Sequence, residues 1–257
     1  MDKIHLKVKR LQIAVMALIV VNLFIMLTAF NDKWEKKEKF DEISVDRINI
    51  VDKKGVTKMV IASNDMIRQD AQDSNVNNDE FRASGILFRN EEGEECGGLI
   101  YHGKKAKDGQ DADASLTFDQ YNQDQNVVLE HKENVTPFES SIEDGLAIIQ
   151  RPDYKKIEQE YKMYDKIGKM QLTQEQKDSV KSFYANEDII GARRLFIGTK
   201  RGTKNSKPYN ETGLFIKDKG GNNAIRIFVD YDNVPHFEVY DKSGKRRIYN
   251  LDLKAAR

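Results

Sequence analysis

Two groups of carboxylates are the residues whose type and spacing could do chemistry in this chain of 257 residues. The first group is Glu91, Glu92, Glu94 and Glu95, and the second is Asp111, Asp113 and Asp119. Two carboxylates about 5–9.5 Å apart across a substrate can hydrolyse a glycosidic bond, and the aspartates could gather a metal ion. One hypothesis is therefore a membrane-bound hydrolase acting on cell-wall or glycan material. The alternative is that these side chains, on a predicted turn and its neighbouring strand, only face water.

Other residue types offer little further chemistry. The four histidines, His5, His102, His131 and His236, stand far apart with no ligand spacing between them. Cys96 is the single cysteine, so no intramolecular disulfide forms, and an inert, partly buried thiol is predicted. Nucleophile-elbow, zinc-binding and phosphate-binding motifs are absent from the sequence. We therefore predict no catalytic residue, cofactor or metal site.

A short pattern recurs four times between stretches that have apolar residues at alternate positions. An Asp or Asn is followed three residues later by Gly, which suits a turn in which the Asx side chain accepts backbone N–H groups and Gly supplies a positive φ. The four predicted structural turns are Asp52 to Gly55, Asn90 to Gly93, Asp218 to Gly221 and Asp241 to Gly244. With strands on both sides, the pattern predicts an array of β-hairpins. Calcium loops, the alternative, need more oxygen ligands at fixed positions.

The segments between these turns are predicted as further strands and three polar loops. The strands are 114–121, 125–132, 145–150 and 192–199, and the loops are 63–81, 104–113 and 200–210. The first loop is long enough to form a binding edge, or it is a disordered connection. The third loop carries several basic residues that could contact phosphate or anionic headgroups, or that are simply solvated.

A helical hairpin is predicted over residues 153–186, between two β regions. Apolar residues of its first helix repeat at helical spacing: Tyr154, Ile157, Tyr161 and Tyr164. This tyrosine stripe is predicted as a packing surface. Asp153 is expected to cap the start of the first helix and Gly168 to follow its end. Thr173 and Gln176 have the form of a capping box that opens the second helix.

Residues 11–30 contain no charged residue and no proline. At 1.5 Å per residue they form a helix of about 30 Å, which matches the hydrocarbon core of a bilayer. We predict an uncleaved transmembrane helix, because the apolar run is longer than that of a signal peptide and Leu27 stands where a small residue is preferred. Lys and Arg are equal in number on the two flanks. The short N-terminus, whose basic residues crowd the span, favours a cytoplasmic N-terminus and an extracytoplasmic C-terminal domain.

Together these features predict an α+β fold dominated by antiparallel strands, with an N-terminal transmembrane helix and an inserted helical hairpin. The predicted segments are a cytoplasmic N-terminus (1–10), the transmembrane helix (11–30), a charged stalk (31–42), a β-hairpin region (43–150), the helical insert (151–190) and a second β-hairpin region (191–257). Whether the strands form a barrel, a sandwich or open stacked hairpins stays undecided at this point.

Three segments carry a resemblance to a known family. They are INIVDKKGVTKMVI (48–61), EEGEECGGLIYHG (91–103) and SLTFDQY (115–121). With the anchor before them, they resemble a family of uncharacterised bacterial single-pass membrane proteins that have D-x-x-G β-hairpin repeats. The resemblance covers most of the β portion but not the helical insert. It implies a bacterial source and transfers no activity or catalytic residue.

The function favoured by the sequence is a non-enzymatic envelope binding or assembly module. The lipid bilayer is one expected partner, and envelope proteins or glycans are the others, because exposed edges of short strands could add partner strands. A net charge of zero argues against a nucleic-acid partner. The hydrolase hypothesis stays as the alternative.

Overall fold

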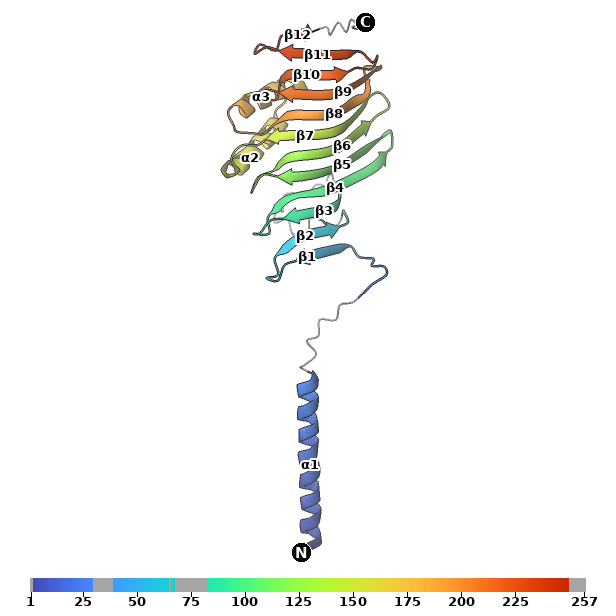
Figure 1. Ribbon diagram of the computed structural model, residues 1–257, viewed down its shortest axis with the longest axis vertical. Coiled ribbons are helices and arrows are strands. Elements are labelled where there is room, and N and C mark those ends of the chain that lie inside the picture. The colour runs from blue at the N-terminus through green and yellow to red at the C-terminus, as the bar shows by residue number, and fades with distance from the viewer. Residues whose placement is uncertain (1, 30–38, 65, 68–82, 250–257) are drawn as a thin grey trace, which may run out of the picture. The chain divides into compact units, whose positions relative to one another are not determined.

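The structure is a computed structural model that describes residues 2–29, 39–64, 66–67 and 83–249 (Figure 1). It divides into two units, Met1–Ser44 and Val45–Arg257. Among the described residues of the first unit, Asp2–Ala29 form the helix α1. Residues Ile4–Met26 of this helix have a mean hydropathy of 1.9, which makes it long and apolar enough to cross a membrane, although a signal sequence meets the same criteria. The amide of Asn22 donates to the carbonyl of Leu18 at 2.9 Å, so this polar side chain is satisfied within the helix.

The second unit is one twelve-stranded sheet in which every strand pairs antiparallel with its neighbours in sequence. Its first six strands are β1 (Arg47–Val51), β2 (Thr57–Ala62), β3 (Ser84–Arg89), β4 (Glu95–Ala106), β5 (Gly109–Asp119) and β6 (Gln125–Val135). The others are β7 (Ser140–Gln150), β8 (Ala192–Lys204), β9 (Lys207–Lys217), β10 (Asn223–Val229), β11 (Pro235–Tyr240) and β12 (Arg246–Tyr249). The α+β, mostly antiparallel prediction is confirmed, and the strands form an open sheet.

The four predicted turns share one geometry. In the first, the N–H of Asp52 donates to the carbonyl of Val56 at 2.9 Å, and the N–H of Gly55 donates back to Asp52 at 3.0 Å. The Asp52 carboxylate accepts from the N–H of Lys54, and Gly55 has a φ of +85°. The other three turns repeat the two backbone bonds and end on glycines with φ between +77° and +86°. All four turns lie at the same end of the strands, because each joins an odd-numbered strand to the next strand.

A fifth turn of this kind was not predicted, because it ends on Asn in place of Gly. Asp230 accepts from the N–H groups of Asp232 and Val234 at 2.9 Å each. Asn233, three residues after Asp230, has a φ of +61°. Asn tolerates this left-handed conformation better than most residues, so the turn forms without glycine.

Two of the predicted loops were wrong. Residues 104–113 belong to β4 and β5 except for a two-residue turn at 107–108, and residues 200–210 belong to β8 and β9 except for Asn205 and Ser206. Both residues of the second turn have positive φ, +52° and +63°, as a type I′ hairpin turn requires. These strand ends extend beyond the core, so they pair through their backbones without apolar alternation. Most of the remaining predicted loop, 63–81, lies outside the described residues, as does most of the predicted stalk.

The helical insert joins β7 to β8 and consists of a 3₁₀ turn, η1 (Tyr154–Lys156), followed by α2 (Ile157–Lys169) and α3 (Gln174–Asn186). The capping box of Thr173 and Gln176 is confirmed. Asp153 caps η1 and not an α-helix. Gly168 was wrongly predicted to follow the first helix, because α2 continues to Lys169 and ends where Met170 adopts an extended backbone.

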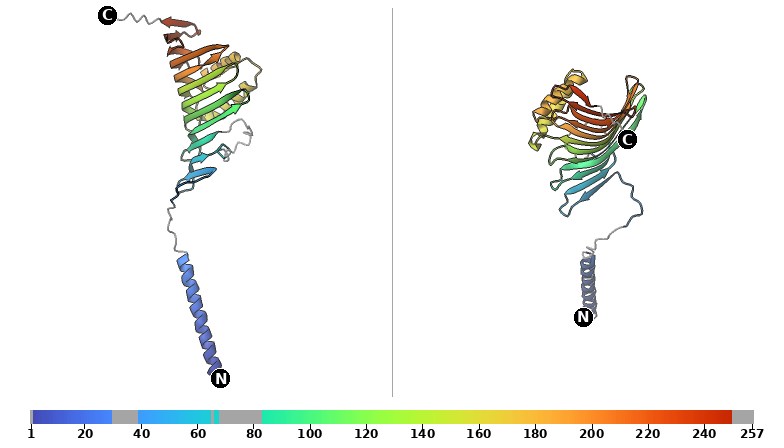
Figure 2. Two further views of the ribbon diagram at one scale, coloured as in Figure 1. Left: turned by 90° about the vertical axis from the view of Figure 1, so that its right-hand side faces the viewer. Right: turned by 45° about the horizontal axis from the view of Figure 1, so that its top comes forward.

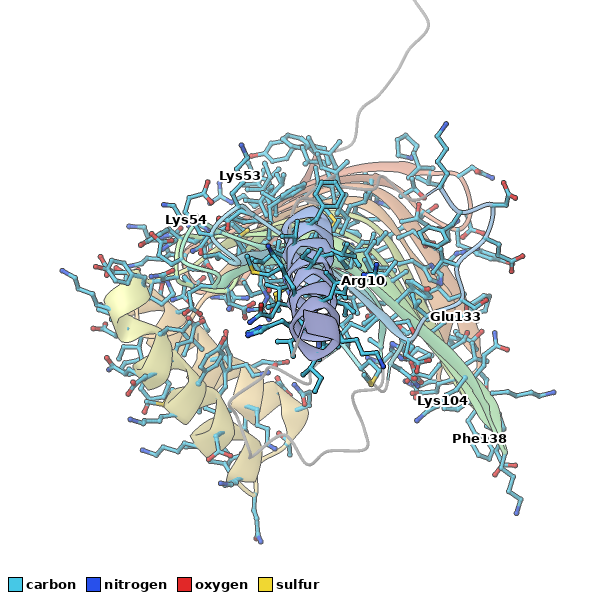
Figure 3. All side chains as sticks on the ribbon, turned by 90° about the horizontal axis from the view of Figure 1, so that it is seen from below. Arg10, Lys53, Lys54, Lys104, Glu133 and Phe138 are labelled. Carbon is cyan, nitrogen blue, oxygen red and sulfur yellow. The ribbon has the colours of Figure 1, made fainter. Side chains whose placement is uncertain are left out.

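The strand register separates the side chains into two faces of the sheet. The covered face carries the buried row Val60, Leu87, Thr117, Val128, Ala147, Phe196 and Phe215. Helices α2 and α3 lie on its concave side (Figures 2 and 3), and Met66 and Ile67 pack against its first strands. We call the opposite, convex side the open face.

Aromatic rings fill the centre of the covered face. Phe196 lies over Gly145 and Gly198, where an added Cβ would come within 2.7 and 2.8 Å of its ring. Phe215 follows at 6.0 Å between ring centroids. Cations lie above these rings, including Lys200 at 4.9 Å from the Phe196 centroid. Because the glycines have no side chains, the rings can lie flat against the sheet, and the core is built on this one face.

Candidate functional site

A groove between α2 and the covered face contains much of the chemistry that the sequence singled out. Its volume is about 620 Å³. Ile157 and Tyr161 of α2 form one wall, and the sheet contributes polar side chains opposite: His102, Asp113, Ser115 and Asp119. Glu94 and Glu95 lie at the strand ends that border the groove. The antiparallel register of β4 and β5 brings these groups together, because it places His102 opposite Asp113.

Asp119 is the most perturbed carboxyl group in the groove. Burial, together with the nearby charges of Glu95 and Asp124, raises the pKa of Asp119 to about 7, although Arg151 opposes the effect. One carboxyl oxygen of Asp119, Oδ1, is buried without a hydrogen-bond partner among the described residues. Burial also raises the pKa of Asp113. Near neutral pH, Asp119 can therefore either donate or accept a proton, as a general acid or base must.

The structure divides the predicted carboxylate groups. Glu91 turns away from the groove and its Oε2 accepts from Lys58 Nζ at 2.6 Å, and Glu92 is exposed on the hairpin turn. Asp111 pairs with His102 at 3.2 Å. Within the described part of the chain, no three His, Cys, Asp or Glu side chains are placed to hold a metal ion. The metal hypothesis for the aspartates therefore gains no support, and only part of the glutamate group borders the groove.

Helix α2 is held in place beside the groove by a buried ion network. The Glu160 side chain is fully buried and accepts from Arg151 Nη1 at 3.0 Å and from the N–H of Gly191 at 2.7 Å. Arg151 Nη2 also contacts Asp124 at 2.9 Å. Removing one partner of such a network leaves a buried charge uncompensated. The network therefore fixes the helix against the sheet and positions the groove wall.

The remaining nucleophile and base candidates do not assemble into a catalytic site. His131 and His236 each contact a single aspartate, Asp144 at 2.6 Å and Asp230 at 2.7 Å. No hydroxyl or thiol nucleophile accompanies them among the contacts of the described residues. Burial and the charge of Asp119 raise the pKa of the Cys96 thiol, so it stays protonated at neutral pH and is a poor nucleophile. The prediction of an inert cysteine agrees with this environment.

The open face is the second candidate site, and the sequence did not reveal it. Side chains that lie directly opposite one another across the strands form two apolar rows. The first row is Ile48, Ile61, Ile86, Leu99, Leu116, Leu129, Leu146, Ile197, Leu214, Ile227, Phe237 and Tyr249. The second row is Ile50, Met59, Phe88, Gly97, Phe118, Val127, Ile148, Leu195, Ile216, Ile225 and Val239, and on β12 it ends at the charged Arg247.

These rows face solvent along the whole sheet. Leu129, near the middle, is 55% exposed, and Ile197 two strands away is 48% exposed. With about 4.8 Å between strands and about 7 Å between side chains two residues apart, the rows cover an area about 55 Å long and 14 Å wide, or roughly 750 Å². The largest apolar patch on a typical monomer is about 300–600 Å². An area of this size marks an interaction surface.

A polar row borders the apolar rows on one side. It includes His131, Asp144, Thr199 and Thr212, which lie opposite one another on β6 to β9. The hydrogen bond from His131 lowers the pKa of Asp144, so this carboxylate is ionised at neutral pH. An apolar centre with a polar border is the arrangement typical of protein interfaces.

No known protein family matches the chain, no curated protein matches it, and no solved structure matches it. The groove and the open face are therefore the two features from which a function can be inferred.

Proposed function

We propose that this chain is a single-pass membrane-anchored protein whose β-rich domain works outside the cytoplasm as a non-enzymatic envelope binding or assembly module. The observation that carries the proposal is the open face. Covering half of its roughly 750 Å² corresponds to roughly 9 kcal/mol of gross transfer free energy at about 25 cal/mol per Å². Part of this is lost to the entropy of association, but the remainder supports a specific complex.

The anchor and its orientation belong to the same proposal. Helix α1 would stay uncleaved in the bilayer with its N-terminus in the cytoplasm, since Lys7, Lys9 and Arg10 stand directly beside the apolar run. The resemblance to bacterial single-pass proteins with D-x-x-G hairpins supports a bacterial envelope as the location. Protease added to intact spheroplasts should digest the C-terminal domain and spare a tag at the N-terminus. Full protection of the domain, or loss of the first thirty or so residues in mass spectra, would contradict this part.

Binding through the open face is tested by photo-crosslinking in membranes. A photoreactive residue replaces Leu129 on the open face, and the matched control replaces Asn134, which is exposed on the same strand but belongs to the other face. We expect ultraviolet light to produce a covalent adduct from position 129 and little or none from position 134. Equal labelling from both positions, or none from position 129, would contradict the proposal.

One observation favours a second candidate function, the hydrolase acting on cell-wall or glycan material. Asp119 has a pKa raised to about 7 and lines, with Glu95, the groove of about 620 Å³. If the groove is catalytic, Asp119→Asn should lower the release of soluble fragments from cell-wall glycan at least 100-fold. The matched control is Glu91→Gln, which changes a carboxylate outside the groove. Absence of fragment release by the unaltered full-length protein would end this alternative.

A further inference from the structure

We infer that the partner of the open face is a second copy of this chain, packed face to face against the first. This inference rests on the proposed function, since it names the partner of the same surface. Two sheets pack about 10 Å apart with their strand directions within about 30° of each other, and their inner side chains interdigitate. The open face has the uniform aliphatic rows that such packing needs.

The rows are self-complementary. A two-fold axis near the centre of the sheet, between β6 and β7, would bring Leu129 and Leu146 of one copy against the same residues of the other. Moving outward, Leu116 would meet the partner's Ile197, and further strands would meet in the same reciprocal way. A two-fold interface uses the same surface on both subunits. Rows composed almost wholly of Ile, Leu, Val and Phe satisfy this requirement, because any aliphatic side chain can pack against another.

The area is appropriate for a dimer. A stable interface buries about 800 Å² on each partner, and the two rows offer roughly 750 Å² before the polar border is counted. The border on the same face, which includes Thr199 and Thr212, would form a polar rim. One of the Thr199 and Thr212 hydroxyls donates to the other at 3.0 Å, and the remaining hydroxyl hydrogen can bond water at the rim. The apolar centre can therefore be covered without stranding these hydroxyls.

Anchoring favours contact between copies. Under the proposed function every copy carries the same helix, α1, followed by the same short segment up to Val45 where the sheet unit begins. Confinement to the plane of a bilayer raises the effective concentration of copies relative to free diffusion in three dimensions.

The bilayer itself is a poorer partner for this surface. In the described part of the chain β1 and β12 each pair with only one strand, so their outer backbone groups would lack partners in hydrocarbon. The border of the open face carries the ion pair of Asp144 and Arg201 at 3.2 Å, and burying such a pair in hydrocarbon would remove the water that solvates it. A protein surface that covers only the apolar rows leaves the strand edges and the charged border in water, so neither the edge backbone groups nor the border is desolvated.

The experiment uses two full-length versions of the chain with different tags, expressed together in membranes. The photoreactive residue at position 129 is activated before detergent is added, so detergent cannot displace a partner. We expect a crosslinked species of two chains that carries both tags. In the same cells, Leu129→Asp combined with Ile197→Asp should lower recovery of one tag with the other at least tenfold. Asn134→Asp, which adds a negative charge on the other face, should change it less than twofold.

The outcomes distinguish the second-copy inference from the proposed binding role of the open face. An adduct from position 129 to a different protein, or to lipid, would overturn the second-copy inference and leave the open face as a binding surface. No adduct at all would overturn both. Leu129 and Ile197 are already about half exposed, so we expect the paired aspartates to fold. If they do not, the doubly tagged crosslink from position 129 decides alone, because it needs no destabilising substitution.

Discussion

Two adjacent residues of β8 allow a direct test of which face of the sheet is the core. Phe196 is 0% exposed and lies among the aromatic rings of the covered face, whereas Ile197 belongs to the open face and is 48% exposed. The two side chains point to opposite sides because side chains alternate along a strand. Replacing each in turn by alanine changes one face and leaves the other untouched.

The expected magnitudes differ clearly. Deleting a buried Phe side chain costs about 3–5 kcal/mol, and the cost rises when the site cannot collapse around the cavity. Phe196 lies over Gly145 and Gly198, which have no side chains to fill the space, so the upper part of that range is expected. Ile197→Ala should cost less than about 1.5 kcal/mol in a single copy, since half of the side chain is already in water. At about 2–4 °C per kcal/mol, Phe196→Ala lowers Tm by about 10 °C or more and Ile197→Ala by a few degrees.

The assay is thermal unfolding of the full-length chain in detergent micelles, followed by circular dichroism in the amide region. Measurement at low protein concentration separates copies of the chain, so the loss reflects one sheet alone. At high concentration the unaltered chain should gain stability from association, and the Ile197→Ala variant should gain less. Equal losses for the two variants at low concentration, or a larger loss for Ile197→Ala, would refute the assignment of the two faces.

Three further predictions concern single groups. Asp119→Asn removes a carboxyl whose pKa rises from about 3.8 in the unfolded chain to about 7 in the folded domain, so ionisation of this carboxyl opposes folding progressively between those pH values. The Tm gain of the variant should therefore be larger at pH 8 than at pH 5. An equal gain at both pH values would contradict the burial of this group. Glu160→Gln should lower the free energy of unfolding by about 3 kcal/mol, because it leaves the buried Arg151 guanidinium without its full charge partner. Glu158→Gln, on the exposed side of the same helix, should lower it by under about 0.5 kcal/mol in the same melting assay. Gly221→Ala should lower the free energy of unfolding by about 1–2 kcal/mol because φ at this position is +82°. Gly221→Asn should lower it less, because Asn233 adopts the corresponding backbone conformation in its own turn. Equal Tm losses for the two variants would argue against backbone strain as the cause.

Much of the fold could be predicted from local sequence signals. The Asx-to-Gly pattern identified four hairpin turns because side-chain acceptors and a positive φ are needed at fixed positions. The Asx-to-Gly pattern did not identify the turn from Asp230 to Asn233, because Asn tolerates the same positive φ as Gly. The polar segments 104–113 and 200–210 resemble loops in sequence because strand ends beyond the core lose apolar alternation while keeping backbone pairing.

The candidate sites depend on long-range arrangement, which local patterns do not contain. Stretches such as Val127-Val128-Leu129 are apolar on both faces, and such runs are typical of strands buried on both sides. The position of α2 and α3 on one side only is set by the buried pair of Arg151 and Glu160 and by packing around Ile167. Asp119 likewise acquires its raised pKa only when α2 and the neighbouring strands remove water from it. Local sequence patterns therefore predict the strands but not which face of the sheet is left uncovered.

The contrast between the edges and the open face of the sheet bears on how this domain would assemble. Addition of partner strands at an edge was the mechanism expected from short exposed strands. Strand β12 has only four residues, two of which are Arg246 and Arg247, and charged, short edge strands are the features that discourage strand addition. The open face has no comparable protection over strands β2 to β11, apart from its polar border. The short, charged β12 edge is poorly suited to strand addition, whereas the two exposed apolar rows suit stacking of sheets. The photo-crosslink from position 129 is accordingly the measurement that separates the two modes of assembly.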